Sequence, residues 1–390
     1  MKIMHVSTRL ILGGSQENTV LSCAGQADDG HEVLLVFGPI EGPEGTMLPA
    51  VEAHGGITPV ETPDLVREIA PRRDWRCLGN LRRLIREHQP DVVHTHSSKA
   101  GILGREAAWR ESVPAVVHTI HGLPFHPYLA KSKNAVYIAA ERWSARRCHA
   151  IVTVADAMRD QALAAGIGRR TQYRTVRSGM LVEPYLDDST SMLETRRRLG
   201  LPEHAFIVGT IARLAELKGH DDLIDALSPK MREDPSLHLL WVGDGYWSDR
   251  LLGRIRELGL EDQVHAPGLV APDRIPEWIR AMDVLAHPSY REGLPRAVVQ
   301  GLLSAKPVVA HDLDGAPEVC IDDVTGLLVR PGDHDGLAAA IDRLRSDPAL
   351  GVRLGAAGRE LVRGPFDHRS MVRELEAVYR TVLDRPERPR

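Results

Sequence analysis

The sequence lacks the features that mark disulfide-bonded, membrane-spanning and nucleic-acid-binding proteins. Its four cysteines stand singly with no C-x-x-C pair, which argues against a disulfide scaffold or zinc ribbon and suits a reducing cytoplasm. No apolar run approaches the ~20 residues of a membrane-spanning helix. His5 and Arg9 interrupt the apolar start, so we expect no signal peptide. The net charge of -4 gives no general reason to expect nucleic acid. We therefore expect a soluble, cytoplasmic protein.

The 390 residues are enough for two domains, and short apolar runs alternate with longer helical patterns in both halves. Val- and Ile-rich runs of this kind are typical of buried parallel strands. They lie at 2–7, 32–38, 91–96, 115–120 and 150–155, and again at 206–212, 237–243, 263–268, 283–289, 306–312 and 326–331. The pattern predicts an α/β protein with two facing, doubly wound (Rossmann-like) domains.

The polar, proline-containing stretch after Val176 sets the predicted domain boundaries. We predict an N-terminal domain over 1–178, a linker over 179–204 and a C-terminal domain over 205–365. A last helix over 366–390 is expected to pack back toward the N-terminal domain, with 385–390 frayed. Ligands of doubly wound sheets bind beyond the carboxyl ends of the strands, so we expect a site in the cleft between the domains.

The stretch "ARLAELKG" places Arg213 at a strand end and Lys218 just before a helix that begins near Asp221. An arginine fork and a lysine charge beside free backbone N–H groups favour binding of a diphosphate. Two solvated surface cations remain the alternative. In the first half, Gly13 and Gly14 follow the first strand and open a helix, where glycines allow phosphate or sugar to approach closely. The dinucleotide fingerprint G-x-G-x-x-G is incomplete there.

Histidines and paired aspartates raise the possibility of a metal. His94 and His96 point to one side of a strand, and Asp312 and Asp314 form a D-x-D. An H-x-H on a later strand and a lone D-x-D are weak metal signals, so we expect no metal site and a hydrogen-bonded histidine lining of the cleft. His121 follows a strand end and precedes a glycine turn, the position expected for a functional histidine.

The stretch 75–87 is a basic amphipathic helix with arginines on one face. Such a face can lie on an anionic membrane surface, but more often it is a solvated face. The sequence leaves both interpretations open, and the inner membrane surface is therefore kept as a partner that the protein could contact peripherally.

Several stretches in order, from "GGSQ" through "TIHG", "ARLAELKG", "VGDG", "HPSYREGLPRAVVQG" and "GAPEV", resemble the retaining glycosyltransferases of family 4, which have the GT-B fold. The resemblance covers essentially the whole chain. It implies a nucleotide-sugar donor with no required cofactor or metal, and it favours a UDP-sugar, which is a common donor among relatives. The acceptor, a glycan, lipid-linked or small molecule, is unknown. The stretches "HSSKAGILG" and "HGLPFHPY" resemble bacterial enzymes of cell-surface or exopolysaccharide assembly.

The resemblance implies roles for individual residues. Those for the diphosphate and nucleotide are Gly13, Gly14, Arg213, Lys218, Val270 and Gln300; those for the donor sugar are His121, Glu292, Gly293, Leu294 and Pro295; those for the acceptor are Ser98 and Lys99. Of these, His121, Arg213, Lys218 and Glu292 are the expected catalytic residues. Arg213 and Lys218 would stabilise the leaving diphosphate.

The sequence departs from the family pattern of Glu, seven residues, Glu. The first glutamate is Glu292, but Gln300 stands in the second position, where a carboxylate usually accepts hydrogen bonds from the ribose. An amide oxygen also accepts, with weaker bonds. A second departure is "SGM" at 178–180, where relatives usually carry an Asn-Gly turn. A UDP-sugar 2-epimerase and a degenerate nucleotide-sugar-binding protein without turnover remain alternatives.

Overall fold

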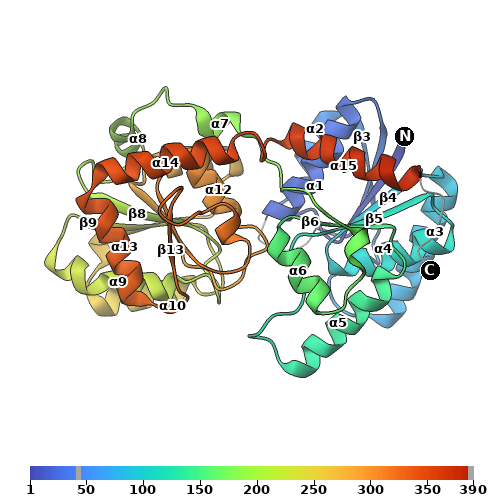
Figure 1. Ribbon diagram of the computed structural model, residues 1–390, viewed down its shortest axis with the longest axis horizontal. Coiled ribbons are helices and arrows are strands. Elements are labelled where there is room, and N and C mark those ends of the chain that lie inside the picture. The colour runs from blue at the N-terminus through green and yellow to red at the C-terminus, as the bar shows by residue number, and fades with distance from the viewer. Residues whose placement is uncertain (41–44, 385–390) are drawn as a thin grey trace. The chain divides into compact units, whose positions relative to one another are not determined.

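A computed structural model describes residues 1–40 and 45–384 of the chain. The chain forms two compact units (Figure 1): unit 1 comprises Met1–Met180 with the segment from Phe366 on, and unit 2 comprises Leu181–Pro365. The stretch 179–204, predicted as a linker, supplies unit 2 with two short helices, α7 (Glu183–Leu186) and α8 (Met192–Leu199). Residues 385–390, predicted to fray, lie outside the described residues.

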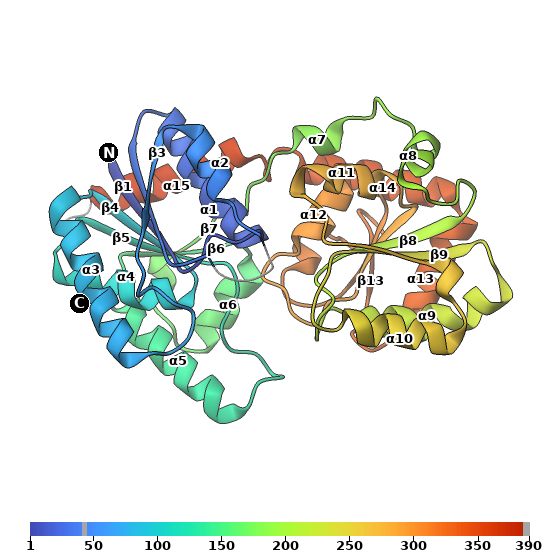
Figure 2. The same ribbon diagram turned by 180° about the vertical axis from the view of Figure 1, so that it is seen from behind.

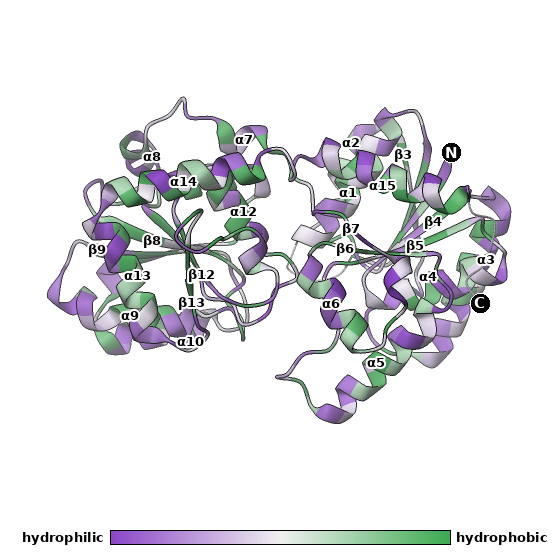
Figure 3. Ribbon diagram, viewed as in Figure 1, coloured by the Kyte–Doolittle hydropathy of each residue, from purple (hydrophilic) through white to green (hydrophobic). Residues whose placement is uncertain are grey.

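Unit 1 is built on a parallel sheet with the strand order β3-β2-β1-β4-β5-β6-β7. The strands are β1 (Lys2–Ser7), β2 (Glu32–Phe37), β3 (Ile57–Glu61), β4 (Val92–His96), β5 (Ala115–Ile120), β6 (Ala150–Thr153) and β7 (Tyr173–Thr175). Every residue of β4 and β5 is buried, as expected for central strands covered on both faces. The hydrophobic colour of the strands in Figure 3 reflects this burial.

Helices cover both faces of the unit 1 sheet. They are α1 (Gly14–Asp28), α2 (Leu48–His54), α3 (Pro71–His88), α4 (Ser98–Arg110), α5 (Lys131–Ala145), α6 (Asp156–Ala164), η1 (Arg170–Gln172) and α15 (His368–Leu383). Figures 1 and 2 show α1, α2 and α15 on one side of the sheet and α3 and α4 on the other. Successive side chains of a strand point to opposite faces of the sheet, so each strand packs against both helix layers. In β1, Ile3 packs with Met371 of α15, whereas Met4 packs with Leu81 of α3. The C-terminal helix thus belongs to unit 1.

Unit 2 repeats this architecture with the parallel strand order β10-β9-β8-β11-β12-β13. The strands are β8 (Phe206–Ile211), β9 (Leu237–Val242), β10 (Val264–Gly268), β11 (Val284–His287), β12 (Val308–His311) and β13 (Leu327–Val329). Besides α7 and α8, the helices are α9 (His220–Glu233), α10 (Ser248–Leu258), α11 (Ile275–Arg280), α12 (Arg296–Leu303), α13 (His334–Ser346), α14 (Pro348–Val362), η2 (Glu261–Gln263), η3 (Pro272–Arg274) and η4 (Ala316–Glu318).

The strand order reverses direction once in each sheet. The reversal lies between β1 and β4 in unit 1 and between β8 and β11 in unit 2. The loops that leave such a pair of strands run in opposite directions, which is where doubly wound folds bind ligands. Gly13 and Ser98 follow β1 and β4, and Arg213 and Glu292 follow β8 and β11. These four residues predicted for function therefore lie at the two switch points.

Candidate active site

The switch point of unit 2 joins two loops through a close backbone approach. Gly219, at φ 75°, precedes α9, and a side chain there would place its Cβ 1.9 Å from the carbonyl oxygen of Pro288. Only glycine permits this contact. The backbone N–H of Tyr290 donates to the carbonyl of Leu217 (2.9 Å), and the Tyr290 hydroxyl donates to Asp222 of α9 (2.7 Å). The loops after β8 and β11 are thus held together as one surface.

The two predicted diphosphate-binding cations lie in different environments on this surface. Arg213 is exposed and has no hydrogen-bond or ion-pair partner among residues 1–40 and 45–384. Lys218 is half-buried, and its Nζ lies 2.6 Å from Oε1 of Glu292. The structure therefore brings Lys218 and Glu292 together, although 74 residues separate them in the sequence.

Glu292 is held by three contacts. Its Oε1 accepts from Lys218 and lies 3.1 Å from Nε2 of His287, and its backbone N–H donates to Asp314 (2.9 Å). Burial alone would raise the pKa of Glu292, but the Lys218 ammonium and the His287 contact hold that pKa well below its usual range. Glu292 is therefore an ionised acceptor of hydrogen bonds at any working pH.

The residues after Glu292 lead into α12. Leu294 and Pro295 are buried, Gly293 is half-buried, and the helix begins at Arg296. Further along α12, the Gln300 amide donates from Nε2 to the Tyr185 hydroxyl of α7 (2.8 Å). Val270, predicted to contact the nucleotide, is half-buried just beyond β10.

In unit 1, α1 begins at Gly14 with Gly13 as its N-cap, directly beyond β1, as the sequence predicted. The side chains of Thr8 and Ser97 join the loops after β1 and β4 by a hydrogen bond of 2.7 Å. His121, just past β5, is half-buried, and its Nε2 lies 3.1 Å from Nδ1 of His96.

Lys99, predicted to contact the acceptor, already has partners within unit 1. Its Nζ lies 2.5 Å from Asp74 of α3 and donates to the carbonyl of Glu68 (2.8 Å). Ser98 begins α4 and is half-buried.

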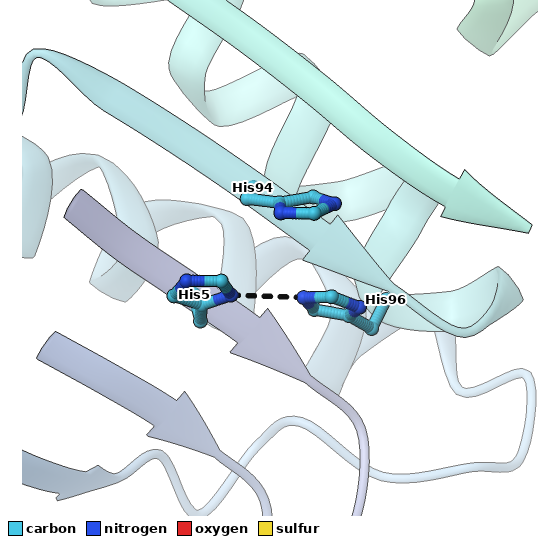
Figure 4. A group of neighbouring side chains, drawn as sticks. All are labelled: His5, His94 and His96. Atoms are coloured by element: carbon cyan, nitrogen blue, oxygen red, sulfur yellow. Dashed lines mark hydrogen bonds between the residues drawn. The ribbon is translucent and has the colours of Figure 1, made fainter. Parts of the chain in front are cut away.

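His94 and His96 form a cluster with His5 of β1 (Figure 4). The three rings are buried between the sheet and the layer of α1 and α15, and His94 contacts Tyr379 of α15. The prediction of hydrogen-bonded histidines is right, but their predicted place along a cleft surface is wrong, because α15 covers them. This is the single group of metal-ligating side chains found in the described parts of the chain, so Asp312 and Asp314 belong to none.

The arginines of α3 that lie within 75–87 are paired with carboxylates. Arg76 contacts Asp64 (2.9 Å), and Arg82 and Arg86 both reach Glu111, at 2.6 and 3.7 Å. These pairs neutralise much of the basic face predicted from the sequence. No helix in residues 1–40 and 45–384 combines the length and apolar character needed to cross a membrane.

Three residues around the site were not predicted from the sequence. His287 supports Glu292, Asp314 holds its backbone, and Tyr185 holds Gln300. His287 could have been found, because it ends an apolar strand five residues before Glu292. Tyr185 gave no such signal, since it lies in the stretch predicted as a linker.

Comparison with known proteins agrees with this architecture. The family model "Glycosyltransferase Family 4" matches residues 12–177, and "Glycosyl transferases group 1" matches residues 191–361. The chain is 26% identical over 320 residues to UDP-Gal:alpha-D-GlcNAc-diphosphoundecaprenol alpha-1,3-galactosyltransferase of Escherichia coli, which covers 81% of this chain and 82% of that protein. It is 27% identical over 344 residues to the putative glycosyltransferase EpsD of Bacillus subtilis, 87% of each.

Solved structures show the same fold. The structure of Anabaena Alr3699/HepE in complex with UDP superimposes with a TM-score of 0.82 at 23% identity, over 98% of this chain and 100% of that one. WaaG, a glycosyltransferase involved in lipopolysaccharide biosynthesis, superimposes with a TM-score of 0.74 at 15% identity, over 97% of this chain and 99% of that one. The chain therefore has the GT-B fold, and it belongs to the glycosyltransferases that join a family 4 domain to a group 1 domain.

Proposed function

We propose that this glycosyltransferase is a retaining hexosyltransferase that uses a UDP-sugar. The observation that carries the proposal is the pairing of Lys218 with the ionised Glu292 at the switch point of unit 2, where Arg213 follows β8. Cations for a diphosphate and a carboxylate for sugar hydroxyls stand next to each other there. The Escherichia coli relative, named for UDP-Gal, and the UDP complex of a structural neighbour support this class of donor.

Lys218 links the two halves of the proposed donor site. An ammonium has three N–H donors, so Lys218 can keep its bond to Glu292 while it donates to the diphosphate. The contacts of the Glu292 carboxylate with Lys218 and His287 both fall on Oε1, and Oε2 can accept from a hydroxyl of the sugar. Arg213 adds a second cation. Charge builds on the phosphate oxygen as the bond to the sugar breaks, and these cations stabilise that state more than the ground state.

Retention follows if the acceptor hydroxyl attacks from the side that the diphosphate leaves. The acceptor O–H bond breaks, its proton passes to the departing phosphate oxygen, and the new bond forms on the same face of the anomeric carbon. Two side-chain cations would serve this reaction without a metal, so we expect activity in the presence of a chelator. We assign contact with the donor sugar to His121, and acceptor binding to unit 1 around Ser98.

Incubation with a panel of nucleotide sugars tests the proposal. Without acceptor, we expect slow hydrolysis of one UDP-sugar, and proton NMR should show the first sugar released in the anomeric configuration of the donor. With bacterial lipid-linked or glycan acceptors, transfer should replace hydrolysis. Formation of a 2-epimer would make the protein an epimerase, and tight binding with no turnover against any acceptor would make it a nucleotide-sugar-binding protein.

A further inference from the structure

A row of hydrogen-bonded side chains runs through unit 1 from α1 to His121. Gln26 Oε1 lies 2.7 Å from His5 Nε2, His5 Nδ1 lies 2.9 Å from His96 Nε2, and His96 Nδ1 lies 3.1 Å from His121 Nε2. Figure 4 shows the central bond, between the facing edges of the His5 and His96 rings. Gln26, His5 and His96 are fully buried or nearly so, whereas His121 is half-buried.

The donor and acceptor of each hydrogen bond in the row are set by the groups at its buried end. The Gln26 amide donates from Nε2 to the Tyr379 hydroxyl (3.2 Å), which leaves Oε1 to face His5. The Tyr379 hydroxyl in turn lies 2.5 Å from His94 Nδ1, to which it can donate its proton. A carbonyl oxygen only accepts, so His5 must carry its proton on Nε2.

The remaining protons follow one by one, because a neutral imidazole has one donor and one acceptor nitrogen. With its proton on Nε2, His5 accepts at Nδ1 from His96 Nε2. His96 then accepts at Nδ1 from His121 Nε2. Burial lowers the pKa of His5 to about 4, with the Gln26 bond opposing it, and burial with nearby histidines lowers the pKa of His96 well below its usual range. Both rings are therefore neutral near pH 7.

A metal ion is the other use of three clustered histidines, and the contacts disfavour it. All six ring nitrogens of His5, His94 and His96 have a partner within unit 1, since His94 also lies 2.7 Å from the Thr119 hydroxyl through its Nε2. The cluster is complete as a hydrogen-bonded network.

We propose that Gln26, His5 and His96 are positioning residues that fix His121 as the tautomer with its proton on Nε2. The value of this tautomer for catalysis rests on the proposed function, in which His121 contacts the donor sugar. The tautomer itself does not depend on the function, so the two can be tested separately.

Nitrogen NMR of protein labelled with ¹⁵N in its histidine rings reads the tautomer directly. The His121 signals are assigned by their loss in His121→Asn. We expect the wild-type ring near pH 7 to show a protonated Nε2 and an unprotonated Nδ1. A proton on Nδ1, or a stoichiometric metal on the purified protein detected by elemental analysis, would overturn the proposal without any need for a variant.

Gln26→Met removes the amide but keeps the length of the side chain, and Ser22→Ala on the same buried face of α1 is its matched control. We expect Gln26→Met to give a mixture of His121 tautomers and to lower kcat by roughly tenfold to hundredfold with little change in KM, the scale found when a partner that orients a functional histidine is removed. Ser22→Ala should change neither. An unchanged His121 tautomer in Gln26→Met overturns the proposed role of the hydrogen-bonded row. A changed tautomer with unchanged turnover supports that role and shows that His121 takes no part in the reaction.

Discussion

At the scale of single residues, Arg213 and Lys218 carry the same charge in different settings. Arg213 is exposed, so Arg213→Ala breaks no hydrogen bond or ion pair within the described residues and should leave the free energy of unfolding within about 0.5 kcal/mol of wild type. If Arg213 stabilises the leaving diphosphate, the same variant should lower turnover on the order of 10²-fold or more. Urea unfolding and donor hydrolysis measure the two effects.

Arg232, exposed at the far end of α9, provides the control. Arg232→Ala should change neither quantity, and near wild-type turnover in Arg213→Ala would remove Arg213 from the site.

Lys218→Ala should also lower turnover at least 10²-fold. Because it leaves the Glu292 carboxylate without its ammonium, it should also lower stability by about 1–3 kcal/mol.

Glu292 and Gln300 should separate turnover from nucleotide binding. Gln300→Glu restores the family carboxylate, and the Tyr185 hydroxyl can donate to it, so we expect an intact fold and UDP affinity that is kept or tightened by roughly 1 kcal/mol. Glu292→Gln should lower turnover far more than UDP affinity, because its proposed contact is to the transferring sugar. Calorimetric titration with UDP and donor turnover decide. If Gln300→Glu lost UDP binding while Glu292→Gln kept wild-type turnover and UDP affinity, the assignments of Gln300 to the nucleotide and Glu292 to the sugar would be reversed.

How far the sequence predicted this site depends on where each partner lies. Arg213, Lys218 and Glu292 follow apolar strands, and parallel strands end at one edge of their sheet, so the sequence alone predicts that these three residues lie close together. The bond between Gln26 and Tyr379 spans 353 residues and exists only because α15 returns to unit 1. No local pattern reports such a return, so the buried row behind His121 could not be predicted.

At the scale of elements, α3 is where the membrane hypothesis can be decided. Its arginines within 75–87 are paired, yet Trp75 is 78% exposed and Ile69, just before the helix, is 75% exposed. If this end of α3 lies on anionic lipid, binding to phosphatidylglycerol-containing vesicles should weaken with salt, since screening shortens the reach of the charges. Trp75→Ala should weaken the binding further.

Vesicle flotation measures this binding, with Trp143→Ala on α5 as a matched loss of a partly exposed tryptophan. No binding even at low salt would leave α3 as a solvated helix. The basic face would then be a set of ion pairs exposed to water, such as Arg76 with Asp64 and Arg83 with Glu87, and not a surface that binds lipid.

The strands show where sequence patterns fail. All interior strands were predicted from apolar runs, but β3 and β7, the two edges of the unit 1 sheet, were not. β3 is largely exposed and contains Pro59, and β7 has 3 residues. An edge strand pairs on one side and is only partly covered, so burial does not demand a continuous apolar run there. The helices α7 and α8 were missed because their stretch is short and polar.

At the scale of the whole molecule, the chain leaves unit 1 and returns to it beside one glycine. A side chain at Gly179 would place its Cβ 2.7 Å from Cα of His368, at the start of α15. Hydrogen bonds between Met180 and both Phe366 and His368 join the outgoing and returning segments. The "SGM" departure from the family pattern thus falls where unit 1 closes, and its glycine permits the close approach.

Titratable groups are buried in both units, which makes the stability of the molecule depend on pH. Burial lowers the pKa of His5 in unit 1 and of His220 and His311 in unit 2 to about 4, below the value of ~6.5 in an unfolded chain. Between pH 6.5 and 4 the unfolded chain therefore binds more protons than the folded one. The stabilisation is complete above pH 6.5 and is lost as the pH falls toward 4, by about 3 kcal/mol for His5 alone.

Urea unfolding at pH 7, 6 and 5 should thus show a falling midpoint for both units, and His204→Gln, which removes an exposed histidine, should keep the whole dependence. His94, His96 and His118 are also buried in unit 1 with lowered pKa values, so we expect unit 1 to lose more stability than unit 2. Protonation of a buried ring would break the hydrogen bond that the ring accepts, so the folded state should resist it. A urea midpoint that stays constant from pH 7 to pH 5 would mean that the folded protein binds as many protons as the unfolded chain, and it would contradict this prediction.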